Sequence, residues 1–122
     1  MKRDMDLIRN VLLWVEDKTD EFNFEEVAID GVDEATVYGH VQMLVNAGYV
    51  EGTDVTTMGI GYRKILPQRL TWRGHEFLEA TRNDTVWAQV KAKVAEHGGS
   101  APFELLKQLA DGYLKQKFGL DK

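Results

Sequence analysis

The sequence predicts a mainly α protein with one small β-hairpin, an α+β fold, and three observations lead to this class. Apolar residues recur at helical spacing in several separate stretches of the 122 residues. Good capping residues, Asp33 and Thr71, stand directly before two of these stretches. Residues 49–66 instead hold two short β runs on either side of a glycine-containing loop. A chain of this length buries one hydrophobic core without disulfides.

The first helix is predicted over residues 4–17, where apolar side chains at helical spacing form one face. Residues 23–29 alternate between apolar and polar side chains, and this alternation predicts an extended segment. A short helix over residues 25–29 fits the same residues nearly as well. The Asp30-Gly31 pair then predicts a turn.

The second helix is predicted over residues 33–47 and ends at Gly48, because glycine tolerates the left-handed conformation that closes many helices. A β run is predicted next over residues 49–55, and the return strand is predicted over residues 62–66. Pro67 confines the chain after this strand to a sheet edge or a bulge, since proline has no N–H to donate.

Three more helices are predicted in the second half of the chain. Thr71 caps the first of them, and residues 84–97 form the second. Ser100 is expected to cap the last helix, over residues 101–118, with Pro102 in its first turn. We therefore expect a domain over residues 1–82, followed by a helical extension over residues 83–122. This extension either packs on the same domain or forms a dimer interface.

The order of capped helix, β-wing and second capped helix is the order in which winged helix-turn-helix domains place a recognition helix against DNA. The end of the predicted second helix supports this interpretation. It resembles the corresponding segment of bacterial winged-helix regulators at His40, Leu44, Ala47, Gly48 and Val50. The fold prediction is thus a winged helix with extra C-terminal helices.

Two motifs resemble a narrower family. These are MKRDMDLIR at residues 1–9 and LTWRGHEFL at residues 70–78. They are similar to small bacterial and prophage proteins classified as a domain of unknown function, over most of the chain. The resemblance implies a winged-helix fold and an association with phages or mobile elements, but no established activity and no catalytic residues. One departure stands out, because residues 22–31 are too few for the full helix that usually precedes a recognition helix.

The predicted recognition helix offers side chains that can contact base edges. Glutamine and asparagine bond to adenine, and threonine or methionine can touch a thymine methyl group. The helix contains no Lys and no Arg, so an ordinary solvated helix face explains the pattern equally well. The residues concerned are Thr36, His40, Met43 and Asn46 on the expected outer face, with Tyr38 and Gln42 at its margins.

A cluster of four cations on the wing and the following helix is the strongest indication of nucleic-acid binding. Wing residues of this kind contact the phosphate backbone in winged domains. The alternative is a charged edge strand, since Lys and Arg on strand edges block unwanted pairing. The four residues are Arg63, Lys64, Arg69 and Arg73.

The acidic N-terminal third of the chain favours a different partner. Residues 1–34 contain four bases and eleven acids, a net charge of −7, whereas the whole chain carries −5. Such a surface repels a phosphate backbone and complements a basic protein. Glu25 and Glu26 are therefore the candidate contacts of a protein–protein interaction module, an inhibitor or adaptor acting on a host or phage protein.

The last two predicted helices suggest a homodimer. Trp87 is expected to fold back into the core, whereas Tyr113 and Phe118 at the far end are candidates for a subunit interface. Aromatic side chains are enriched at such interfaces. The sequence leaves the oligomeric state open.

No catalytic site, metal site or cofactor is expected. The three histidines, His40, His75 and His97, fall on three separate predicted helices, and the chain has no Cys. Gly59-Ile60-Gly61 lacks the remaining residues of a phosphate-binding loop. No apolar run is long enough to cross a bilayer and the N-terminus resembles no export signal, so a cytoplasmic location is expected.

The sequence therefore predicts a non-enzymatic winged-helix protein of phage or mobile-element type that binds double-stranded DNA and acts in regulation. The protein–protein interaction module without DNA binding is the alternative.

Overall fold

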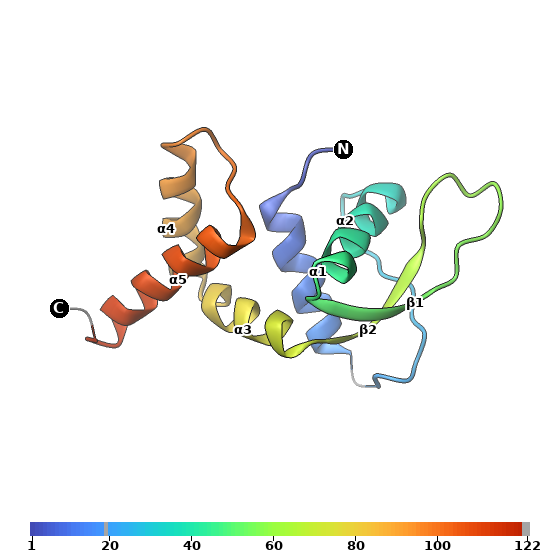
Figure 1. The fold of residues 1–122 in the computed structure, drawn as a ribbon, viewed down its shortest axis with the longest axis horizontal. Helices are drawn as coiled ribbons and strands as arrows, with labels where there is room; N and C mark the ends of the chain where they lie inside the picture. Colours follow the sequence, from blue (N-terminus) through green and yellow to red (C-terminus); the bar gives the residue numbers. More distant parts are fainter. Residues whose placement is uncertain (19, 121–122) are drawn as a thin grey trace. The chain divides into compact units, whose positions relative to one another are not determined.

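The computed structural model describes residues 1–18 and 20–120 and confirms the predicted α+β class. Within these residues, five α-helices accompany one antiparallel pair of β-strands (Figure 1). Their order is α1 (Met5–Asp17), α2 (Glu34–Asn46), β1 (Val50–Asp54), β2 (Ile65–Leu70), α3 (Trp72–Thr81), α4 (Asp84–Ala95) and α5 (Phe103–Lys117).

The chain divides into two compact units, Met1–His75 and Glu76–Lys122. The division lies inside α3, so the first turn of this helix belongs to the first unit and the remainder to the second. The sequence predicts the corresponding boundary after residue 82. No described helix combines the length and the apolar character needed to cross a membrane.

Helix α1 begins at Met5, one residue after the predicted start, with Asp4 as its N-cap. The Oδ1 atom of Asp4 accepts hydrogen bonds from the backbone N–H groups of Asp6, at 2.9 Å, and Leu7, at 3.1 Å. These bonds satisfy donors that have no partner inside the helix. The apolar stripe of α1 packs against α2 and β2, and its buried members are Leu7, Ile8, Val11, Leu12 and Val15.

The segment from residue 20 to residue 33, here called the connecting segment, contains no helix and no paired strand. Residues 24–29 are assigned to no helix and no strand, so the predicted short helix over 25–29 is wrong, and the extended chain does not pair as a strand. Side chains instead provide hydrogen-bond partners for backbone N–H groups of this segment. The N–H of Val27 donates to the hydroxyl of Tyr38 at 3.0 Å, and the N–H of Phe22 donates to the carboxylate of Asp20 at 2.9 Å.

Both ends of α2 form as the sequence predicts. The carboxylate of Asp33 accepts from the backbone N–H of Thr36 at 3.1 Å and from its hydroxyl at 2.8 Å. At the other end, Gly48 has a φ of +84°, in the left-handed region that favours glycine. The N–H of Tyr49 then donates to the carbonyl of Leu44 at 2.9 Å, which directs the chain into β1.

Strand β2 is shifted from the predicted range of 62–66, because it begins only at Ile65 and runs through Pro67 to Leu70. The register shifts between Glu51, which faces Arg69, and Gly52, which faces Pro67. This irregularity confirms that the proline lies at a bulge, where its missing N–H breaks no regular ladder. A Cβ atom on Gly52 would lie 2.5 Å from the carbonyl oxygen of Leu66, so the bulged strands approach too closely for a side chain there.

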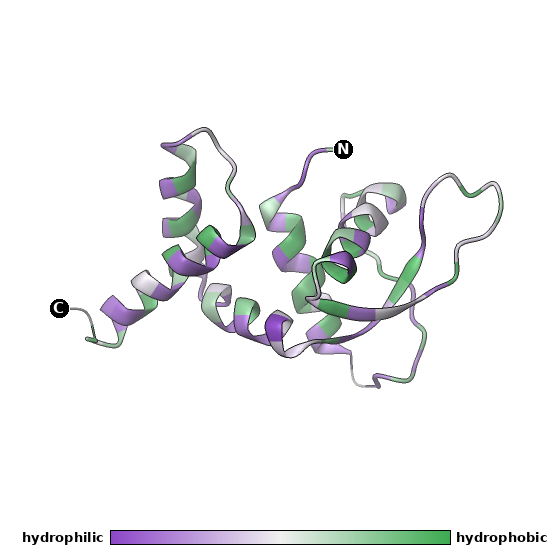
Figure 2. Ribbon diagram, viewed as in Figure 1, coloured by the Kyte–Doolittle hydropathy of each residue, from purple (hydrophilic) through white to green (hydrophobic). Residues whose placement is uncertain are grey.

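The second unit is built from the rest of α3 and the helices α4 and α5. Asn83 caps α4 by accepting from the N–H of Val86 at 3.0 Å, and α4 packs against α5. Trp87 is buried, as predicted, and the rings of Phe77 and Phe103 meet edge to face with their centroids 5.2 Å apart. Hydrophobic and hydrophilic residues alternate around α4 and α5, as expected for amphipathic helices (Figure 2).

The predicted cap of α5 is wrong. The helix begins at Phe103 with Pro102 as its N-cap, and no side chain caps it. The carbonyl of Pro102 accepts from the N–H of Leu106 at 3.1 Å, so the N-cap lies two residues after Ser100 and the helix begins three residues after it. The hydroxyl of Ser100 is therefore too early in the chain to serve as the N-cap.

Candidate functional site

The four predicted phosphate contacts, Arg63, Lys64, Arg69 and Arg73, are here called the cation cluster. Arg63 and Lys64 precede β2, Arg69 lies on β2, and Arg73 lies in the first turn of α3. All four belong to the first compact unit. The partners of these side chains determine what the cluster can bind.

Arg63 is paired with Asp54 at the end of β1. Its Nη1 donates to Asp54 at 2.7 Å, while Thr56 donates to the other carboxylate oxygen through its N–H, at 2.9 Å, and its hydroxyl, at 2.6 Å. These bonds favour the charged carboxylate and lower the pKa of Asp54 to about 2. The hydroxyl of Thr56 contributes most, followed by its N–H and then by Arg63.

Replacing Thr56 with valine, which keeps the shape and removes the hydroxyl, is expected to raise the pKa of Asp54 toward the ordinary value of 3.8. The carboxylate resonance of Asp54, followed by NMR across an acid titration, measures this shift. Because the folded-state pKa lies below the unfolded-state value, the stabilisation from Asp54 is present above about pH 4 and is lost as the pH falls toward 2. The pKa of Asp33, held low by Thr36, serves as an internal control and should not move. An unchanged pKa of Asp54 would contradict the assignment.

Lys64 lies between two carboxylates of the acidic N-terminal third. Its Nζ donates to Glu26 and lies 3.3 Å from Glu34, and it stands 5.5 Å from the ring centre of Tyr38. Only 16% of the lysine side chain is exposed. The hydrogen bond to Glu26 is the main cause of the raised pKa of Lys64, so the ammonium stays charged and bound to the carboxylate.

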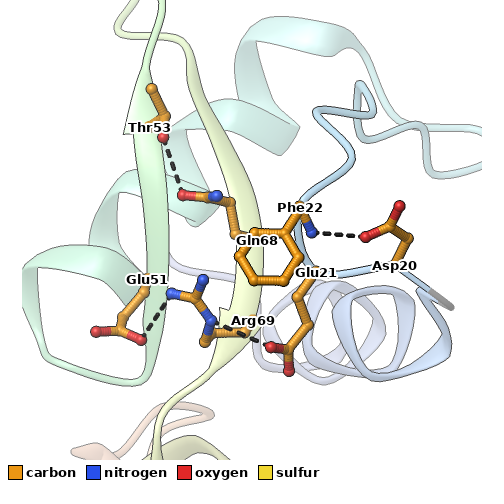
Figure 3. A network of polar contacts seen from close by, with 7 residues as sticks. All are labelled: Asp20, Glu21, Phe22, Glu51, Thr53, Gln68 and Arg69. Atoms are coloured by element: carbon orange, nitrogen blue, oxygen red, sulfur yellow. Dashed lines mark hydrogen bonds and ion pairs between the residues drawn. The ribbon is translucent and has the colours of Figure 1, made fainter.

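Arg69 connects β1, β2 and the connecting segment (Figure 3). Its Nη1 donates to Glu51 at 3.2 Å and its Nε donates to Glu21 at 3.4 Å. The bond to Glu51 is the main cause of a raised pKa of the guanidinium. Figure 3 also shows Thr53 donating to Gln68 across the hairpin, at 2.9 Å.

Arg73 has a structural contact at the end of α2. Its Nη1 donates to the carbonyl of Ala47 at 3.4 Å, and its guanidinium lies 5.2 Å from the ring centre of Tyr49. A cation suits this position because the C-terminal carbonyls of a helix carry partial negative charge. Three of the four cations are therefore ion-paired with carboxylates, and the fourth contacts a helix end.

Two residues of the predicted base-reading surface are buried, so the expectation that His40 faces outward and Tyr38 lies at the margin is wrong. The Nε2 of His40 accepts from the N–H of Asp4 at 2.9 Å, and its Nδ1 lies 2.9 Å from the carbonyl of Thr36, to which it donates. Tyr38 holds the connecting segment through Val27 and stacks on the ring of Tyr62, with centroids 5.9 Å apart. Both side chains have 0% exposure.

The buried stripe of α2 is wider than the sequence suggested, because α2 packs on one side against α1 and on another against both strands. Of the remaining candidates, Thr36, Gln42 and Met43 are half-buried and Asn46 is exposed. The structure therefore leaves a smaller accessible surface on this helix than the six residues predicted. None of these four residues is charged.

A pocket of about 330 Å³ adjoins the connecting segment and the start of α2. Sequence reasoning missed this pocket, because residues 26–32 have no regular periodicity that would assign their side chains to one face. The apolar residues of the connecting segment were the one feature of the sequence that could have indicated a pocket. The pocket, here called the 26–37 pocket, is lined by Glu26, Val27, Ala28, Ile29, Val32, Glu34 and Val37.

The remaining candidates are spread over the two units. Glu25 accepts from the side-chain amide of Asn23 at 3.1 Å, and Glu26 pairs with Lys64. In the second unit, Tyr113 is half-buried and Phe118 is 75% exposed. Within residues 1–18 and 20–120, no three His, Asp or Glu side chains are grouped so that they could hold a metal ion.

The fold and site together define a small α+β protein in which ion pairs join a two-stranded hairpin to an acidic connecting segment. The chain belongs to the family described as Hypothetical protein (DUF2513), whose sequence profile matches residues 2–100. This confirms the predicted membership of a family of unknown function. A Haemophilus influenzae protein named as uncharacterized is 32% identical over 117 residues, which cover 95% of this chain and 98% of the relative. No solved structure matches the chain.

Proposed function

We propose that this chain is a non-enzymatic protein-interaction module that binds a basic partner protein. The observation that carries the proposal is the ion pairing of the cation cluster. Arg63, Lys64 and Arg69 all form ion pairs with carboxylates of the same chain, so the residues best suited to phosphate already have anionic partners.

The distribution of charge supports the same conclusion. The first compact unit contains eight Lys and Arg residues and thirteen Asp and Glu residues, so it carries the whole net charge of −5. Binding to DNA is driven largely by release of counterions when cations neutralise phosphates. In this unit a phosphate would have to displace a carboxylate from each paired cation and approach against a net negative field.

We also propose that the first unit is a variant winged helix. The order of α1, α2, the β1–β2 hairpin and α3 supports this arrangement. In this variant the connecting segment occupies the place of the helix that usually precedes the recognition helix. That substitution changes what the domain presents beside α2, since an acidic irregular segment replaces a regular helix.

DNA binding and regulation, with a phage or mobile-element origin, is the second candidate. The accessible part of α2 favours it, because Gln42 and Asn46 carry the amide groups that can bond to adenine and Thr36 and Met43 can touch a thymine methyl group. For either role we propose the cytoplasm as the location, since a sequence without Cys suits a reducing compartment. A homodimer through Tyr113 and Phe118 remains a prediction that a solution mass would test.

A salt series of binding to random duplex DNA separates the two candidates. The interaction proposal predicts no detectable binding at low salt, both for the unaltered chain and for the Arg63→Ala/Lys64→Ala variant. Binding that weakens steeply with salt, with a shallower dependence in the double variant, would support the DNA candidate and overturn the first.

Affinity capture of partner proteins provides the complementary measurement. Reversing Glu25 and Glu26 to lysine is expected to change the set of captured proteins, because it reduces the net charge of residues 25–34 from −5 to −1. The matched control reverses Glu96 and Glu104, two exposed acids of the second unit, and should leave the set unchanged. Equal effects of the two reversals would count against a specific acidic interface.

A further inference from the structure

We propose that the 26–37 pocket is the docking site for one aliphatic side chain of a short basic segment in the partner protein. This inference rests on the proposed interaction function and names the chemistry of the partner. It rests on a pocket whose walls are mainly aliphatic and whose lining also includes the exposed carboxylates of Glu26 and Glu34.

Five of the seven residues that line the pocket are aliphatic, and the other two are Glu26 and Glu34. Val27 and Val37, with 4% and 1% exposure, belong to the core, whereas Ile29 and Val32 are half-buried and Ala28 is exposed. Its volume of about 330 Å³ lies at the small end of the range for ligand sites, roughly 300–1,000 Å³. A single side-chain anchor with its neighbouring backbone suits this size better than a helix or a large cofactor.

The charge around the pocket selects a basic partner. Residues 25–34 contain five acids and no base. Lys64 reaches two of them, but one ammonium against two carboxylates leaves negative charge in excess. The side chains of Glu26 and Glu34 are 65% and 54% exposed, so a cation from outside can approach them without displacing Lys64.

This combination discriminates between classes of partner. Nucleic acid and anionic lipid headgroups are repelled by the carboxylates, and a small inorganic cation would leave the apolar walls uncovered. A peptide with one leucine or isoleucine between lysines or arginines satisfies both features, since its aliphatic group fills the pocket while its cations face the acids. Such electrostatic complementarity contributes mainly to the association rate and to the choice of partner.

The test uses the full chain and three synthetic peptides. The first has one leucine flanked by lysines, the second replaces the leucine with serine, and the third replaces the lysines with glutamates. Binding is followed by NMR through the backbone amides of Val27, Ile29 and Val32. The first peptide should shift these signals, the serine peptide should bind about tenfold or more weakly, and the glutamate peptide should not bind.

Two variants of the chain test the two features separately. Ala28 lines the pocket and is exposed, so Ala28→Leu takes up space in the pocket and should weaken binding of the leucine peptide while leaving the acids intact. Glu26→Gln with Glu34→Gln should weaken binding and flatten its dependence on salt. Glu96→Gln with Glu104→Gln is the matched control and should change neither. Unfolding midpoints establish that each variant is folded.

The outcomes are distinguishable from failure of the proposed function. If the leucine and serine peptides bind equally, or if Ala28→Leu binds as tightly as the unaltered chain, the pocket proposal is overturned. The acidic interface would then still stand if reversal of Glu25 and Glu26 changes the captured proteins. If the variants change neither peptide binding nor the set of captured proteins, both the pocket proposal and the interaction function are overturned.

Discussion

Replacing Gly74 with alanine is expected to lower the free energy of unfolding by about 3 kcal/mol, at the upper end of the usual cost of overpacking. A Cβ atom at this position would lie 2.1 Å from the carbonyl oxygen of Tyr49, far inside van der Waals contact. The carbonyl is fixed, because it accepts the N–H of Thr71 at 3.1 Å. The clash is therefore with backbone and is relieved only if the start of α3 moves away from Tyr49, the residue before β1. Urea unfolding of the purified chain measures the loss.

Two other glycines provide controls for the helix propensity of alanine. At Gly112, on α5, an added Cβ would meet nothing within 4 Å, so Gly112→Ala should raise stability by about 0.5–1 kcal/mol. At Gly39, on α2, the added atom would meet the flexible end of the Met1 side chain, which can move aside. If Gly74→Ala unfolds at the same urea concentration as these variants, the close approach of α3 to Tyr49 is contradicted.

Replacing His40 with alanine is expected to destabilise the chain by about 3 kcal/mol. The imidazole is fully buried and uses both nitrogens, accepting from the N–H of Asp4 and donating to the carbonyl of Thr36. Alanine removes both bonds, leaves the N–H of Asp4 without its partner and opens a cavity, and these losses add to roughly this amount. The N-terminal turn of α1 should become less ordered, because the histidine connects it to α2.

The same substitution at His75 is the control, since this histidine lies exposed on α3. His75→Ala should change stability by less than about 0.5 kcal/mol, as is usual for surface positions. Amide hydrogen exchange at Leu7 and Ile8 reports on the N-terminal turn of α1 directly. Unaltered exchange there, together with an unaltered unfolding midpoint in His40→Ala, would show that the histidine has no anchoring role.

The elements that could be predicted are those fixed by local chemistry. Asp33 caps α2 through a bond to a residue three positions away, and Thr71 accepts from the N–H of Gly74 at the same spacing. Gly48 and Pro67 act through their own backbone conformations. Interactions of this kind involve only residues that are close together in the sequence. For this reason the helix order and the hairpin follow from the sequence.

The elements that could not be predicted depend on partners far away in sequence. The connecting segment is held by Val27 against Tyr38 and by Glu21 against Arg69, and the second pair is separated by 48 positions. Helical spacing predicts His40 as a surface residue, but in the folded chain it accepts a hydrogen bond from Asp4, 36 positions earlier. Helical spacing alone gives no information about these contacts, so it misplaced the boundary between buried and accessible residues on α2.

The candidate site likewise combines a feature that the sequence predicts with contacts that it does not predict. The sequence identified the cations of the wing, and their residue types do indicate an anionic partner. It offered no means of recognising that the anions are Asp54, Glu26, Glu34, Glu51 and Glu21 of the same chain. The 26–37 pocket was missed because its walls come from an irregular segment and from the buried side of α2.

The hydroxyl of Thr71 donates to the carbonyl of Gly48 at 2.6 Å while accepting from the N–H of Gly74. One side chain thus joins the end of α2 to the start of α3 and closes the base of the intervening hairpin. The helices are held together below the hairpin, independently of its tip around Met58, which is fully exposed. Lengthening or shortening that tip changes loop entropy only slightly and leaves the helices in place. Related chains can therefore diverge in the length and composition of the tip while keeping a common helical frame.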